Sequence, residues 1–142
     1  MLGVIFSIIA GAAMSFQGVM NTRLGDKIGL YEANAFVQFI AFLLSVIALL
    51  IMGNGDIKSI TQVDKWYLLG GVLAIVITIS VMLGIGNLSP TIAISIILIS
   101  QLAVAAVIDA FGILGSEKVA FGWTKFAGLG LMIGGVILFK IK

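Results

Sequence analysis

The stretch WYLLGGVLAIVITISVMLGIGNLSPTIAISIILISQLAVAAVIDAFGIL, residues 66–114, consists of two long apolar runs with a short break at residues 87–90. A helix needs about 20 apolar residues to cross a hydrocarbon core about 30 Å thick, because it rises about 1.5 Å per residue. Each run has that length, so the stretch predicts two membrane-spanning helices. Pro90, the single proline, suits the first turn of the second helix. The short break predicts that the two helices are antiparallel neighbours.

Further apolar runs lie on both sides of this stretch. Together they predict an all-α polytopic membrane protein, a single transmembrane domain with five helices at approximately residues 2–20, 33–52, 66–88, 90–114 and 123–139. Trp66, Tyr67 and Trp123 stand at the starts of segments, where interfacial aromatic residues are common. The first run lacks the basic n-region of a signal peptide and contains Gln17 and Asn21, so we interpret it as a spanning helix.

The composition excludes several classes of protein. Hydrophobic residues make up 61% of the chain and charged residues 10%, whereas a soluble domain has about 25% charged residues. Lipid must therefore face most of the surface. Without Cys or His the chain lacks thiol nucleophiles and the usual zinc, haem and iron–sulfur ligands, so we expect no cofactor and no metal site. No basic patch points to nucleic acid, and no catalytic group of residues points to an enzyme.

The basic residues are divided evenly between the two sides of the membrane. With five spans, the N-terminus and the loops after the second and fourth helices share one side. That side carries Lys58, Lys65, Lys118 and Lys125. The opposite side carries Arg23, Lys27, Lys140 and Lys142. A bias in this count selects the orientation of insertion, so its absence predicts insertion both ways and an antiparallel homodimer. A miscounted helix, or dominance by a few charges near the ends, would also explain the balance.

Four amides lie in pairs inside the first two segments. Gln17 and Asn21 are four residues apart and share a helix face, and Asn34 and Gln38 repeat this spacing. Polar side chains in lipid tend to face a protein interior or a wet cavity. Each pair is compatible with hydrogen bonding between helices and with lining a substrate site.

The fourth segment follows a similar four-residue rhythm through Gln101, Ala105 and Asp109. Asp109 is the only carboxylate inside the predicted segments. It is either an interfacial acid paired with a nearby Lys or a proton or cation site, and it is the candidate proton-coupling group. Glu32, just before the second segment, is interpreted as a solvated acid of a first helical turn.

Small residues form a second pattern that predicts close helix packing. The first segment has a stripe of Gly11, Ser15, Gly18 and Thr22, and the fifth has a Gly-x-x-x-Gly spacing at Gly130 and Gly134. Such residues let helix backbones approach closely. With 18 glycines in the chain, the pattern indicates packing and specifies a dimer only weakly.

Two stretches, GAAMSFQGVMNTRLG (11–25) and QLAVAAVIDAFGILG (101–115), resemble the YdcZ-like family of small bacterial inner-membrane proteins in the drug/metabolite transporter superfamily. The first-helix motif of that family is matched by Gln17, Asn21 and Leu24. The fourth-helix motif is matched by Gln101, Asp109, Phe111, Gly112 and Gly115. The start of the third helix is matched by Trp66, Tyr67, Gly70 and Gly71. The resemblance covers essentially the whole chain and implies five helices and export across the inner membrane.

The chain departs from this family at three positions. Ala110 stands where the family often has His, Ser100 where it often has Gly, and Ala74 where a Gly is common. The missing His weakens any mechanism in which Asp109 shares a proton with a neighbour. Some relatives are fused tandem copies, which fits an antiparallel pair.

These observations predict a secondary transporter that exports a small molecule as an antiparallel homodimer with alternating access. Its expected partners are the lipid bilayer, a second copy of itself and a small-molecule substrate, with no nucleic acid. The predicted substrate-binding residues are Gln17, Asn21, Gln101, Asp109, Asn34 and Gln38. The alternatives are a passive dual-topology ion channel and an accessory subunit of a membrane complex.

Overall fold

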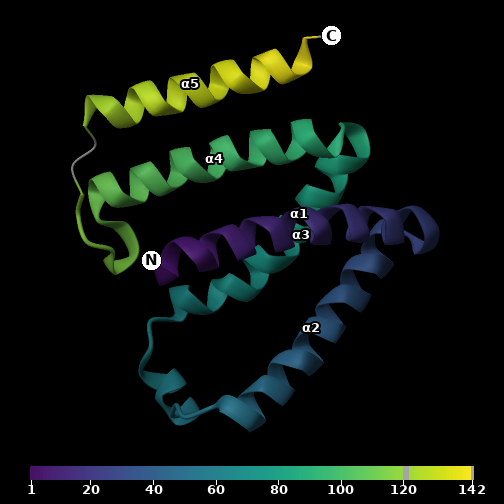
Figure 1. Ribbon diagram of the computed structural model, residues 1–142. Helices are drawn as coiled ribbons and strands as arrows, with labels where there is room; N and C mark the ends of the chain where they lie inside the picture. The colour runs from purple at the N-terminus through teal and green to yellow at the C-terminus, as the bar shows by residue number, and fades with distance from the viewer. Residues whose placement is uncertain (120–121, 142) are drawn as a thin grey trace. The chain divides into compact units, whose positions relative to one another are not determined.

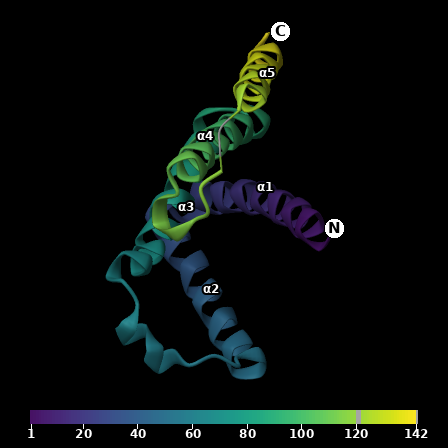
Figure 2. The same cartoon turned by 90° about the vertical axis from the view of Figure 1, so that its left-hand side faces the viewer.

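The computed structural model describes residues 1–119 and 122–141, and all regular structure in that part of the chain is helical (Figures 1 and 2). The α-helices are α1 (Leu2–Ile28), α2 (Leu30–Met52), α3 (Gly70–Asn87), α4 (Pro90–Phe111) and α5 (Trp123–Lys140). Three short 3₁₀ helices are η1 (Ile57–Gln62), η2 (Lys65–Leu69) and η3 (Ile113–Gly115). The all-α prediction is confirmed.

The chain divides into two compact units, Met1–Gly86 and Asn87–Lys142. In the first unit α2 leaves α1 at a sharp corner, and α3 returns to pack against the C-terminal half of α1 (Figure 1). In the second unit α4 and α5 run antiparallel and side by side (Figures 1 and 2). The antiparallel pairing of α3 with α4 stays a prediction.

Helix α1 extends to Ile28, past the predicted end of the first apolar segment at Met20. Arg23, Asp26 and Lys27 therefore lie inside the helix instead of ending it. The reason is that hydropathy marks where a helix leaves lipid, whereas Arg, Lys and several other polar residues sustain a helix in water.

The break between α1 and α2 is the single residue Gly29, which has a φ of 104°. L-residues with a side chain rarely adopt this conformation, and an added Cβ there would collide with the carboxylate of Glu32. Glu32 lies exposed in the first turn of α2, as predicted, where the helix dipole favours a negative charge.

The connection between α2 and α3 contains four of the eight charged side chains of the first unit. Asp56 caps η1, since its carboxylate accepts hydrogen bonds from the Lys58 backbone N–H at 3.0 Å and the Ser59 hydroxyl at 3.0 Å. The predicted third segment began at Trp66, which lies in η2, and α3 itself begins at Gly70.

Helix α4 begins at Pro90, as predicted, with the Ser89 hydroxyl accepting a hydrogen bond from Ile92 N–H at 3.4 Å. It ends at Phe111 because Gly112 adopts the left-handed conformation with φ 65°. The predicted fourth segment continued to Leu114, which instead belongs to η3.

Very few apolar side chains are buried within the described chain. The buried hydrophobic residues are Ala33, Met82, Ile85 and Ala93. Large side chains such as Phe16, Leu50 and Leu131 are 72%, 80% and 78% exposed. A water-soluble monomer rarely exposes apolar surface on this scale, so these side chains require lipid or another protein surface.

Four stretches in the described residues are long and apolar enough to cross a membrane: Leu2–Ile28, Leu30–Met52, Lys65–Asn87 and Pro90–Phe111. The apolar helix at Trp123–Phe139 is shorter. The chain is therefore a multi-pass membrane protein.

Candidate functional site

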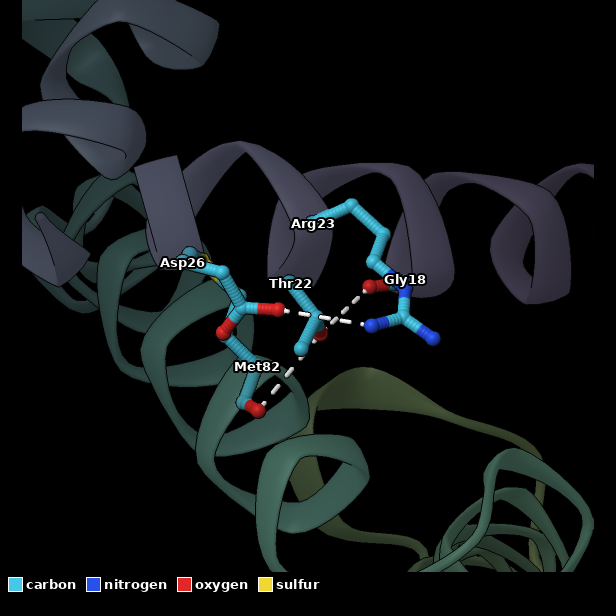
Figure 3. A network of polar contacts seen from close by, with 5 residues as sticks. All are labelled: Gly18, Thr22, Arg23, Asp26 and Met82. Carbon is cyan, nitrogen blue, oxygen red and sulfur yellow. Dashed lines mark hydrogen bonds and ion pairs between the residues drawn. The ribbon is translucent and has the colours of Figure 1, made fainter. Parts of the chain in front are cut away.

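Helices α1 and α3 approach closely where α1 presents Gly18. A Cβ added at Gly18 would lie 2.8 Å from Cδ1 of Ile85 and 3.0 Å from Cγ1 of Val81. One turn further, the buried Thr22 hydroxyl donates to the Gly18 carbonyl at 2.8 Å and lies 3.5 Å from the Met82 carbonyl of α3 (Figure 3). The close backbone approach thus depends on the absence of a side chain at Gly18.

The contact of Arg23 with Asp26 lies beside this crossing but contributes little to it (Figure 3). The two charged groups are 3.6 Å apart, and their side chains are 80% and 58% exposed. Exposed ion pairs of this kind contribute at most about 1 kcal/mol.

A small cavity with both polar and apolar lining residues lies between α1 and α3. Its volume is about 40 Å³, and its lining residues are Met14, Gln17, Gly18, Asn21, Ile77, Thr78 and Val81. The residues from α1 are spaced i, i+3, i+4 and i+7, which places them on one helix face. The cavity exceeds the roughly 10–15 Å³ that one water requires, and amide and hydroxyl groups supply hydrogen-bonding partners.

Thr78 connects this cavity to α2. Its hydroxyl donates to the Ala74 carbonyl at 2.8 Å, and its oxygen accepts from Nε2 of Gln38 at 3.5 Å. The second bond is long, so it is weaker than a typical amide bond of about 2.9 Å. Sequence reasoning missed Thr78 because a lone Thr in an apolar run ordinarily bonds its own helix and gives no pattern of its own.

Asn34 differs from the other amides because its side-chain oxygen is buried without a hydrogen-bond partner among the described residues. The residue is 7% exposed, and its Oδ1 atom is buried without a hydrogen bond to any described residue. An unpaired buried amide oxygen costs a few kcal/mol in an apolar medium, so this atom needs a further hydrogen-bond donor.

The remaining predicted site residues lie in the second unit. Gln101 is exposed and Asp109 is half-buried. The structure therefore places Gln17, Asn21 and Thr78 in the lining of one cavity. Gln38 donates a hydrogen bond to the Thr78 hydroxyl. Gln101 and Asp109 belong to the other unit, so their place beside that group stays a prediction.

Asp109 lines a larger cavity between α4 and α5, with a volume of about 470 Å³. Helix α4 contributes Leu102, Ala105, Ala106 and Asp109. Helix α5 contributes Lys125, Gly128, Leu129 and Met132. Both sets have i, i+3, i+4 and i+7 spacing, so one face of each helix forms a wall. A second cavity between the same helices, of about 410 Å³, has an entirely apolar lining that includes Phe111 and Phe126.

The glycine stripes have different surroundings. Gly18 packs against α3, but a Cβ added at Gly11, Gly130 or Gly134 would meet no atom within 4 Å. The Ser15 hydroxyl donates to the Gly11 carbonyl of its own helix at 3.0 Å. Packing of these other small residues against a helix stays a prediction.

Apolar helices of spanning length, with amide and hydroxyl side chains gathered between them, define a multi-pass membrane protein with a polar interior. The chain belongs to the family described as "Putative inner membrane exporter, YdcZ", which matches residues 2–138. This agrees with the resemblance seen in the first and fourth helices. The protein is thus a multi-pass protein of the bacterial inner membrane, in a family of exporters and not of enzymes. Comparisons with curated proteins and with solved structures gave no match.

Proposed function

We propose that the protein is a secondary transporter that exports a small molecule and works as an antiparallel homodimer with alternating access. Export follows from the family, which matches nearly the whole chain. The main support for a transport site is the set of polar side chains Gln17, Asn21 and Thr78. They line a cavity between helices that are otherwise apolar. Polar side chains at membrane depth are costly and tend to line substrate or ion pathways.

Five spanning helices are part of this proposal. Helix α5 has 18 residues, which corresponds to about 27 Å at 1.5 Å per residue. That is close to the thickness of a hydrocarbon core of about 30 Å, and Trp123 at its start suits an interface. With α5 as a fifth span, the two termini lie on opposite sides of the membrane.

The antiparallel homodimer rests on the balance of basic residues. With four basic residues on each side, no charge bias selects one orientation of insertion into the membrane. Two oppositely inserted copies share a two-fold axis in the membrane plane, which is the symmetry that many transporters build from inverted repeats. The two ends of the dimer are then equivalent, so exchange between them is alternating access. Lys142, one of the residues counted, lies outside the described part of the chain.

Features of the exposed surface support the proposal that a second copy of the chain binds there. The Gly11 and Gly130 backbones are open to approach, and the Asn34 Oδ1 atom lacks a hydrogen-bond donor among the described residues. In the dimer we expect both copies of Gln17, Asn21, Asn34 and Gln38, with Gln101 and Asp109, to contribute to one polar pathway. A second copy or a bound substrate would supply the missing hydrogen bonds.

Flux through liposomes tests the proposal. Purified protein is screened for compounds that raise its unfolding temperature, and each positive compound is followed across liposomes with and without a proton gradient. We expect saturable flux that depends on the gradient and is at least tenfold lower for the Gln17→Ala/Asn21→Ala double variant. Ser45→Ala is the matched control, since the Ser45 hydroxyl bonds the Ala41 carbonyl of its own helix at 2.7 Å.

Two outcomes would contradict the proposal. Rapid, non-saturating flux that no gradient drives would indicate a channel. Complete inactivity of the purified protein, regained only with another membrane protein, would indicate an accessory subunit.

A further inference from the structure

The cavity between α4 and α5 has one charged end and one apolar end. Asp109 of α4 and Lys125 of α5 both line it, and Leu102 and Met132 lie one to two turns further along the same faces. Because α4 and α5 are antiparallel, the end of α4 that carries Asp109 adjoins the start of α5 that carries Lys125. The rest of the described lining is apolar.

The space in this cavity comes from small residues in its walls. Ala105 and Ala106 face Gly128 across the gap, and a Cβ added at Gly128 would meet no atom within 4 Å. A volume of about 470 Å³ falls within the range of roughly 300–1,000 Å³ that small-molecule sites occupy.

The two charges stand at the wrong ends of their helices for helix stability. Asp109 lies in the last turn of α4, where the helix dipole disfavours a negative charge, and Lys125 lies in the first turn of α5, where it disfavours a positive charge. Neither charge therefore stabilises its own helix through the helix dipole. Each charge shares the cavity with the opposite charge and with any ligand that enters it.

We infer that this cavity binds a zwitterionic small molecule with an apolar body. Its cationic group would lie at Asp109, its anionic group at Lys125, and its apolar body against Ala105, Ala106 and Leu129. Charge complementarity selects this class, because a ligand with a single charge would face one attractive and one repulsive group. The inference names the substrate class of the proposed exporter and rests on that function for its physiological meaning.

Four compounds with one ring system and different charges test the inference. They are tryptophan (zwitterion), tryptamine (cation), indole-3-acetate (anion) and tryptophol (neutral). Their binding to the purified full-length protein in nanodiscs is measured by calorimetry, without any gradient or transport. We expect tryptophan to bind at least tenfold more tightly than tryptophol, and both singly charged compounds to bind more weakly than tryptophan.

Removing one charge should change the order of affinities in a defined direction. In Asp109→Asn, Lys125 stays and indole-3-acetate should become the tightest ligand. In Lys125→Met, Asp109 stays and tryptamine should become the tightest. The controls Glu117→Gln and Lys118→Met change the net charge equally in the exposed loop after α4 and should keep tryptophan first.

A further variant fills the cavity without altering its charges. Gly128→Leu should weaken all four compounds together and keep their order. If Asp109→Asn fails to fold, Gly128→Leu still tests whether the compounds bind in this cavity. Equal affinities for tryptophol and tryptophan, or an order that is the same in wild type and in Lys125→Met, would overturn the inference.

These results separate the inference from the proposed function. Charge-dependent binding without flux for any compound would contradict the transporter proposal alone. Flux in liposomes, with an affinity order that neither Asp109→Asn nor Lys125→Met alters, would contradict the zwitterion site alone.

Discussion

The side-chain nitrogen of Gln38 in α2 lies 3.5 Å from the hydroxyl oxygen of Thr78 in α3. Thr78 also lines the cavity that Gln17 and Asn21 of α1 line. Three helices of the first unit therefore contribute to one polar group, although their other side chains are mainly apolar.

Replacement of Thr78 by Val removes the hydroxyl and preserves the shape of the side chain. We expect a loss of stability below about 1 kcal/mol, because hydrogen bonds between membrane helices average about 0.6 kcal/mol. Substrate affinity should fall by a larger factor, since the cavity loses one of its polar groups. Unfolding of the purified protein and binding of a compound from the stabilisation screen measure the two effects. Equal affinity in Thr78→Val and Ser45→Ala would exclude Thr78 from the site.

Gly18→Leu should destabilise the packing of α1 against α3. The new side chain would enter space held by Ile85 and Val81, and overpacking of this kind costs about 1–3 kcal/mol. Gly3→Leu is the matched control, since a Cβ at Gly3 meets no atom within 4 Å. Denaturant unfolding of both variants measures the difference. If Gly18→Leu were as stable as Gly3→Leu, the close approach of α1 and α3 would be wrong.

Asp109→Asn should remove the dependence of transport on pH. Asp109 is the only carboxylate in the predicted apolar segments, and Asn keeps its shape while losing the titratable proton. The dimer should persist, because the change is isosteric and the residue is only half-buried. Initial flux rates in liposomes at a series of pH values, with Glu117→Gln as the control, measure the effect. Unchanged pH dependence in Asp109→Asn would remove Asp109 from the coupling mechanism.

The two termini should lie on opposite sides of the membrane in every molecule. The chain contains no Cys, so Leu2→Cys and Ile141→Cys introduce single reactive positions. In sealed vesicles an impermeant thiol reagent should label a fraction of each variant, and a doubly substituted molecule should be labelled at one position only. Labelling of both positions in the same molecule would mean that α5 does not span.

Shifting the balance of basic residues should lock the orientation. Arg23→Gln/Lys27→Gln leaves two basic residues against four, and Lys58→Gln/Lys65→Gln produces the opposite bias. Each variant alone should lose transport, and co-expression of the two should restore it. Arg23→Lys/Lys27→Arg keeps the charges and should remain active alone. Full activity of each biased variant alone, with its orientation shown to be uniform, would contradict the antiparallel dimer.

The sequence by itself determined the class of protein and the location of its helices. Each of the five predicted segments overlaps one of the helices α1–α5, because the cost of placing a residue in lipid depends mainly on its own side chain and is summed along the chain. The family could also be recognised from the sequence, because residues of its motifs stand at Gln17, Asn21, Gln101 and Asp109. Helix ends were less predictable, because α1 continues past Met20 through Arg23 and stops only at Gly29.

Only the tertiary structure decided which residues meet. The glycines of α1 have the same local pattern, yet Gly18 packs against Ile85 whereas Gly11 has open space beside it. Likewise, no local pattern placed Thr78 beside Gln38, or Lys125 in the same cavity as Asp109. These contacts depend on the rotation and crossing of each helix, which follow from how whole faces fit together. Hydropathy is similar all around such helices, so it gives no information about that rotation.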